Sequence, residues 1–90
     1  MNVNYDKIPS HMQGAAQRYI ENGIAPGSFL TAVICNDLMG AFERADEINA
    51  AAMRDWVIFF YNDAPSICWG SPDKFNAWIA KGGMKQEQAT

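Results

Sequence analysis

The sequence contains few residues that bind metals or perform covalent chemistry. It has 1 histidine, His11, and 2 cysteines, Cys35 and Cys68, in 90 residues. Two cysteines are too few for a disulfide-rich scaffold, and neither shows the close Cys/His spacing of a zinc site. A general base also needs a partner group and a pocket, and the sequence around His11 supplies neither. We therefore expect no metal, no cofactor and no catalytic residue, and we predict that the protein is not an enzyme.

Charges of one sign do not cluster, and no apolar run is long. The 7 Lys and Arg residues are interspersed with 10 acidic residues, for a net charge of −3. Nucleic-acid binding depends on clustered basic side chains, so we expect no direct contact with DNA or RNA. The longest uninterrupted apolar run, Trp56–Tyr61, is far shorter than the roughly 20 residues that cross a membrane. Residues 1–9 lack the pattern of a signal peptide, so we expect a cytoplasmic protein with no membrane partner.

Apolar side chains at helical spacing are what the sequence has in quantity. Hydrophobic residues make up 49% of the chain, and the stretch from Phe29 to Tyr61 places most of the large ones three or four positions apart. This spacing predicts an all-α fold, a small bundle of about four helices in a single domain over residues 1–90. The expected helices are 10–22, 28–44, 46–62 and 71–81, after an extended lead-in at 1–9 and before a frayed tail at 84–90.

Local signals set the expected helix ends. Ser10 with Gln13 fits a capping box, in which each side chain satisfies a free backbone N–H. Ser28 and Asp46 are the expected N-caps of the next two helices. Asn22-Gly23 is typical of a left-handed helix end.

The boundary between the second and third helices stays open at the level of sequence. Apolar spacing continues from 28 to 62 with almost no change of phase. One helix of that length would span about 51 Å at 1.5 Å per residue, which is too long for a compact monomer of this size. We therefore favour a break near Arg44–Asp46. A continuous helix would need a second copy of the chain to cover it, and a homo-oligomer stays open for that reason.

The polar pair Asn36-Asp37 interrupts an apolar stretch that is expected to be helical. Its side chains either satisfy backbone groups at a helix crossing or contact a ligand or partner. Asp37 and Arg44 are two turns apart on one face of that expected helix, in range of an ion pair. Together with Ser71, which opens the last expected helix, Asn36, Asp37 and Arg44 form our candidate ligand-binding set.

Aromatic residues are many for so short a chain, with 3 Trp, 3 Tyr and 5 Phe. A domain of this size cannot bury all of them, and aromatic residues outside a core often anchor interfaces. Tyr61 and Trp69 flank one loop, and Asp55 and Asp63 give the third expected helix an acidic margin. These four residues, Asp55, Tyr61, Asp63 and Trp69, form our candidate partner-binding set.

The chain resembles a family of short proteins encoded by phages and prophages. The resemblance covers nearly the whole chain up to Ile79. It rests on Tyr5, Ile8-Pro9, His11-Met12, Tyr19-Ile20, Gly23, Pro26-Gly27-Ser28-Phe29-Leu30, Asn36-Asp37-Leu38, Ala45-Asp46, Asn49, Tyr61-Asn62, Ala64-Pro65, Trp69-Gly70-Ser71-Pro72 and Trp78. It carries over no functional residue, but it implies a phage accessory protein in the cytoplasm of a bacterial host.

Two functions follow as hypotheses. The first is a non-enzymatic accessory protein that binds and inhibits a host protein, such as an anti-defence factor of the anti-CRISPR kind. The alternative is an oligomeric binder that sequesters a small nucleotide signal.

Overall fold

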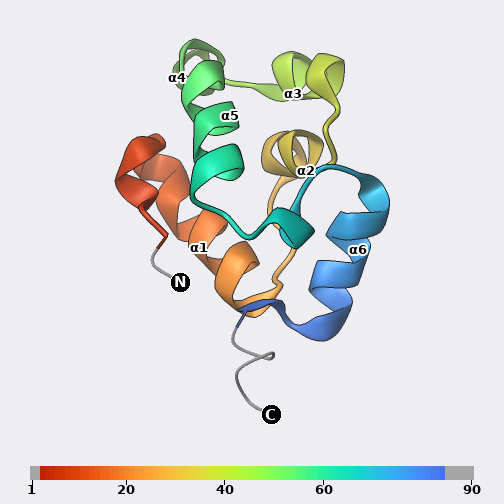
Figure 1. Cartoon of the computed structure of the whole chain (residues 1–90). Coiled ribbons are helices and arrows are strands. Elements are labelled where there is room, and N and C mark those ends of the chain that lie inside the picture. The colour runs from red at the N-terminus through yellow and green to blue at the C-terminus, as the bar shows by residue number, and fades with distance from the viewer. Residues whose placement is uncertain (1–2, 85–90) are drawn as a thin grey trace.

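The computed structural model describes residues 3–84, and this part of the chain is all-α, without a strand (Figure 1). The fold class is the predicted one, but the helices are shorter and more numerous. Three short 3-10 helices accompany them in the described residues: η1 (Tyr5–Lys7), η2 (Ser10–Met12) and η3 (Ser66–Cys68). The α-helices are α1 (Gln13–Asn22), α2 (Ser28–Ile34), α3 (Leu38–Arg44), α4 (Glu47–Ala51), α5 (Met53–Asn62) and α6 (Pro72–Lys81).

The predicted helix 28–44 is wrong, because the chain breaks at Asn36 and Asp37 into α2 and α3. Asn36 has a left-handed backbone with a φ of 64°, a conformation that asparagine adopts more readily than most residues. Asp37 then acts as the N-cap of α3, since its Oδ1 accepts the backbone N–H of Gly40 at 3.0 Å. Asn36-Asp37 therefore ends one helix and begins the next, where the sequence analysis placed it inside a single helix.

The predicted break near Arg44–Asp46 is confirmed, and the predicted helix 46–62 has a further break. α3 ends at Arg44, and Asp46 caps α4 by accepting the N–H of Asn49 at 2.7 Å. At Ala52 the backbone leaves helical geometry, with φ −95° and ψ 12°, and α5 starts at the next residue. No continuous helix from 28 to 62 forms, so the described residues need no second chain to cover one.

Two predictions near the N-terminus are also wrong. The lead-in is not extended throughout, because η1 lies within it and packs against α1 and α5. The capping box of Ser10 and Gln13 does not form, because Ser10 already lies in η2, and Gln13 Nε2 donates to the carbonyl of Ile8 at 3.2 Å. Gln13 therefore ties η2 to the lead-in.

Of the remaining local signals, one N-cap is wrong and two helix ends are confirmed. Ser28 is the first residue of α2, and Gly27 stands at its N-cap without a side-chain bond. Ser71 caps α6 through Oγ, which accepts from the N–H of Lys74 at 3.2 Å. Gly23 ends α1 in the left-handed region, with a φ of 69°. In the predicted tail, Met84 packs against the core, and residues 85–90 lie outside the described part of the chain.

Aromatic side chains that also make hydrogen bonds form the centre of the core. Trp78 Nε1 reaches the carbonyls of Tyr19 and Ile20 at 3.0 and 3.1 Å, and the Tyr19 hydroxyl donates to the carbonyl of Cys68 at 2.6 Å. These bonds join α1, α6 and η3 and satisfy polar groups that would otherwise be costly to bury. The ring of Phe29 packs edge-on against Trp56, with centroids 5.7 Å apart, and so joins α2 to α5.

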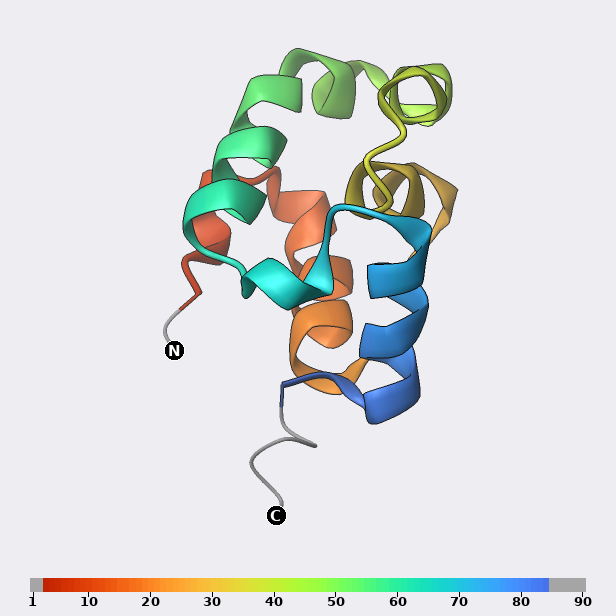
Figure 2. The ribbon, with the colours of Figure 1, turned by 45° about the vertical axis from the view of Figure 1, so that its right-hand side comes forward.

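The ends of α1 and α6 meet at one end of the molecule (Figure 1). Gly23 and Gly83 lie backbone to backbone there, and a Cβ on either would overlap the other segment. At the opposite end, Figures 1 and 2 both show α3 above α2, with α5 standing apart from α3. Leu38 of α3 and Val57 of α5, both exposed, line a hollow between these two helices.

Candidate functional site

The short helix α3 exposes most of its apolar side chains. Its large apolar residues Leu38, Met39 and Phe42 have exposed fractions of 59%, 80% and 48%. The helix contacts chiefly α2 and buries only Gly40 and Ala41 against it. A Cβ at Gly40 would overlap the carboxylate of Asp37 that caps the helix, so a larger residue there would have to displace that side chain. α3 therefore packs against α2 through its small residues and leaves its large apolar side chains exposed.

The edge of α5 toward α3 also exposes apolar surface. Val57 and Tyr61 have exposed fractions of 57% and 75%. They are four positions apart and so share one edge of the helix. Ile48 of α4 is exposed as well. Exposed apolar residues scattered singly need no explanation, but several on neighbouring helices indicate an interaction surface.

Two small hollows lie along α5. One is lined by residues of α2, α3 and α5, and the other by the end of α2, by α5 and by Trp69. One has a volume of about 60 Å³ and the other about 80 Å³, and they share Val33, Asn36 and Val57. We call the joined hollows the α3–α5 groove. Its lining residues are Val33, Asn36, Asp37, Leu38, Ala41, Met53, Trp56, Val57, Phe60 and Trp69. Asp37 is the one charged residue among them.

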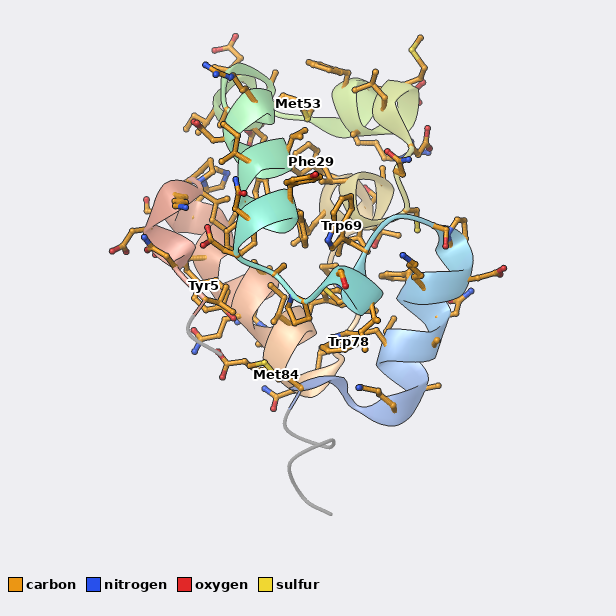
Figure 3. The ribbon with its side chains drawn as sticks, in the orientation of Figure 1. Tyr5, Phe29, Met53, Trp69, Trp78 and Met84 are labelled. Carbon is orange, nitrogen blue, oxygen red and sulfur yellow. The ribbon has the colours of Figure 1, made fainter. Side chains whose placement is uncertain are left out.

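Each hollow has the size of a side chain and not of a cofactor. Pockets for drug-sized ligands occupy roughly 300–1,000 Å³, far more than the two volumes here. Figure 3 shows Met53, Phe29 and Trp69 one below another between α5 and the pair formed by α2 and α3. The groove is therefore suited to single side chains that project from a larger partner.

Trp69 closes the groove at the end away from Asp37. Its ring lies 6.3 Å from the ring of Tyr61 and 6.4 Å from that of Phe60, between centroids. The backbone beside it is fixed, because the N–H of Gly70 donates to the carbonyl of Ile34 at 2.7 Å. Trp69 Nε1 is buried and has no hydrogen-bond partner among the described residues.

The structure brings together two of the four residues in the candidate partner-binding set. Tyr61 and Trp69 lie side by side at the groove. Asp63 instead forms an ion pair with Lys7 of η1, with Nζ and Oδ2 2.8 Å apart. Asp55 is exposed but lies about 120° around α5 from Tyr61, at 3.6 residues per turn. The acidic margin and the aromatic pair are thus on different sides of α5.

The candidate ligand-binding set is also divided. Asp37 and Arg44 line a hollow of about 370 Å³ together with Pro26, Ser28, Thr31, Ala32 and Cys35. They form no ion pair there, because Arg44 Nη1 donates to the carbonyl of Gly40 at 3.2 Å. Asn36 lines the α3–α5 groove and Ser71 caps α6, so neither reaches the 370 Å³ hollow.

The thiols are held in their protonated form. Burial raises the pKa of Cys68 to about 12, and it also raises the pKa of Cys35, with a further contribution from the charge of Asp37. Because the thiolate is the reactive form, both cysteines are poor nucleophiles at neutral pH.

His11 has a partner that the sequence does not reveal. Its Nε2 lies 3.0 Å from Asp46 Oδ2, thirty-five positions away in the chain. Both side chains are substantially exposed, so the contact joins η2 to the start of α4 at the surface and not in a pocket. Within residues 3–84, no group of three or more His, Cys, Asp and Glu side chains is placed to hold a metal ion.

The groove residues on α3 are the part that sequence reasoning missed. Leu38, which lines the groove, and Phe42, which is exposed on the same helix, follow the apolar spacing of α2 in sequence, and that spacing assigns them to the core. The left-handed turn at Asn36 changes the direction of the chain, so the spacing no longer predicts which way they face. Asn36-Asp37 followed by Gly40 was the available signal, because Asn and Asp are typical of a turn and of an N-cap.

Comparison of the chain with protein-family models, curated proteins and solved structures gave no match. The resemblance to a phage protein family therefore stays a prediction. None of the helices in the described part of the chain is long and apolar enough to span a bilayer.

Proposed function

We propose that this protein works by binding another protein in the α3–α5 groove and has no catalytic activity. The observation that carries the proposal is the exposed apolar surface of α3 and α5. Leu38 and Val57 are exposed and line the groove, and Met39, Phe42 and Tyr61 are exposed on the same two helices. Roughly 25 cal/mol is gained for each Å² of apolar surface removed from water. Because these side chains stay exposed in the folded chain, burial of their surface contributes little free energy to folding. A partner that covers them would gain that free energy on binding.

The aromatic pair at the end of the groove supports the same proposal. Tyrosine and tryptophan are enriched among the residues that dominate binding energy, because a large rigid ring buries much area at little entropic cost. Trp69 is half-buried and fixed by its neighbours, and Tyr61 is exposed beside it. Such a preorganised ring loses little conformational freedom when it is covered.

We propose further that the partner is a host protein and that the chain is a phage accessory factor that inhibits it in the bacterial cytoplasm, in the manner of an anti-defence protein. The support is the resemblance of its sequence pattern, together with the small size of the domain and a surface suited to binding. Protonated thiols and a surface-exposed histidine also favour a binding role over a covalent or acid–base one.

Site-specific photo-crosslinking in bacterial lysate tests the proposal. A benzophenone amino acid is placed at Leu38 or Val57, which line the groove, and at Asp55 on the other side of α5 as the matched control. We expect one host protein to be crosslinked from Leu38 and Val57 and not from Asp55. With that protein purified, Val57→Lys is expected to weaken binding at least about tenfold, or 1.4 kcal/mol. Equal crosslinking from Asp55, or unchanged binding by the variant, would contradict the proposal.

A small-ligand role is the second candidate, and the hollow shared by Asp37 and Arg44 favours it. Its volume of about 370 Å³ is in the range of ligand pockets, and Arg44 is suited to bind a phosphate. The Asp37 carboxylate opposes a phosphate, however, and makes a nucleotide a poorer fit than the residue pair alone indicates. Thermal-shift measurements with cyclic and linear nucleotides test this role. A shift that Arg44→Ala removes would support it, and no shift with any nucleotide would exclude it.

A further inference from the structure

We infer that the partner enters the α3–α5 groove as an amphipathic α-helix with a basic side chain at the Asp37 end. This inference rests on the proposed function and specifies its partner. It follows from the length of the groove, from the elements that form its walls, and from its charge.

The length of the groove matches the spacing of side chains on a helix. Along α5 the lining runs from Met53 to Phe60, seven positions or about 10.5 Å at 1.5 Å per residue. That is the distance between side chains at i and i+7 of a partner helix. The two hollows are about one helical turn apart along α5, so apolar side chains at i and i+3 or i+4 would enter one hollow each.

The walls favour a helix over an extended segment. An added strand needs the free edge of a sheet for its hydrogen bonds, and residues 3–84 contain no strand. The groove is instead lined along one side by α5, and along the other by α3 at the Asp37 end and by the end of α2 and Trp69 at the far end; Figure 2 shows how α2, α3 and α5 are arranged. A third helix laid between them would pack side chains into grooves as neighbouring helices in a bundle do.

The charge of the groove selects a basic helix. Asp37 is the one charged lining residue, and it belongs to the hollow that Leu38 and Met53 also line. Its Oδ1 already accepts from Gly40. Arg44 is the nearest basic residue, but it lines the 370 Å³ hollow and not the groove, its Nη1 donates to the carbonyl of Gly40, and no ion pair joins it to Asp37 in the described residues. Arg54 is exposed and lines neither hollow. A Lys or Arg of the partner would therefore meet Asp37, and the chain's net charge of −3 would attract it.

Synthetic peptides test this inference without knowledge of the partner. The probe is a stapled helical peptide with leucine at i, i+4 and i+7 and one lysine placed one turn before the first leucine. One control carries glutamate in place of that lysine, and a second has the same composition with the leucines spread around the helix. Binding is followed by ¹⁵N NMR of the folded protein.

The tryptophan side chains provide the readout. The chain has 3 Trp; the indole N–H groups of Trp56 and Trp78 have acceptors at 3.3 and 3.0 Å, whereas that of Trp69 has none. We expect the lysine peptide to shift the Trp69 indole resonance and to leave that of Trp78 unchanged. The glutamate peptide is expected to bind at least tenfold more weakly, and the scrambled peptide not to bind.

Asp37→Asn isolates the charge from the fold. Asparagine is as good an N-cap as aspartate, so the variant retains the cap of α3 and is expected to keep the helical circular dichroism of the parent. It should bind the lysine and glutamate peptides equally. If the parent already binds both peptides equally, or binds the scrambled one as well, the inference is overturned.

Two further outcomes separate this inference from the proposed function. If a host protein is crosslinked from Val57 but no helical peptide binds the groove, the inference of a helical partner is overturned. The proposal that the groove binds a protein is then retained. If light scattering shows a dimer that Val57→Lys converts to a monomer, the groove is occupied by a second copy of the chain, and both proposals are overturned.

Discussion

The helices α2 and α3 are the same length, lie one above the other and differ completely in burial. Each has 7 residues. α2 buries Phe29, Leu30, Ala32 and Ile34, because it lies between α3, α5 and the loop that carries Trp69. α3 buries only Gly40 and Ala41, because α2 is its main neighbour. Apolar side chains at similar spacing therefore build the core in one helix and form a surface in the other.

The difference indicates which apolar residues the fold needs. Removal of a side chain from α2 leaves a cavity, whereas removal from the outer face of α3 changes only the exposed surface. The large apolar residues of α3 therefore contribute little to folding, and a partner that covers them is the role proposed above for them. Substitutions in the two helices, and in the residues that join α3 to its neighbours, test this comparison.

The largest expected effect is a matched pair of leucine truncations. Leu30 of α2 is completely buried and Leu38 of α3 is 59% exposed. Leu30→Ala should lower the free energy of unfolding by about 2–5 kcal/mol, and Leu38→Ala by no more than about 0.5 kcal/mol. Urea denaturation monitored by circular dichroism measures both. A similar decrease in the free energy of unfolding for the two variants would mean that α3 is covered in solution. It would contradict the proposed difference between α2 and α3.

A smaller effect is expected at Asn36, which separates the two helices. Its φ of 64° costs about 1–2 kcal/mol for most side chains, so Asn36→Ala should be destabilising by about 1 kcal/mol. Asn36→Gly should be close to neutral, because glycine adopts this conformation freely. Thermal melts of both variants provide the measurement. Stabilisation by alanine would show that α2 and α3 form one continuous helix in solution.

The smallest expected effect concerns Asp46, which caps α4 just after α3. The backbone N–H of Asn49 and the nearby His11 lower the pKa of the Asp46 carboxyl below its ordinary value of 3.8. Because the pKa of Asp46 is lower in the folded protein than in the unfolded chain, its carboxylate stabilises the folded state. That stabilisation is fully present when the pH is above the unfolded pKa, and it is lost as the pH falls through the folded pKa. We expect the stability difference between the parent chain and Asp46→Asn to shrink as the pH is lowered below 3.8. A difference that is constant with pH would show that the cap does not depend on charge.

Several features that depend on a few neighbouring residues were predicted correctly from the sequence, although the capping box of Ser10 and Gln13 and the N-cap at Ser28 were not. The end of α1 at Gly23, the cap of α4 at Asp46 and the cap of α6 at Ser71 are all as expected, since each is decided within one turn of chain. The residues Asn36-Asp37 were also a local signal for a break between helices. They were assigned to the interior of one helix because the apolar spacing before them continues after them with almost no change of phase. The position of Asp63 was beyond such reasoning, because its partner Lys7 lies far away in sequence.

The sequence by itself determined that this chain is helical and where most of its turns fall, because capping and left-handed ends are decided by adjacent residues. Only the tertiary structure decided which apolar side chains are buried. Burial depends on whether a second element covers a given face: α2 is covered on several sides, whereas the outer face of α3 is left in water beside α5. The candidate site consists of that uncovered surface, and no pattern within a single helix distinguishes it from the core.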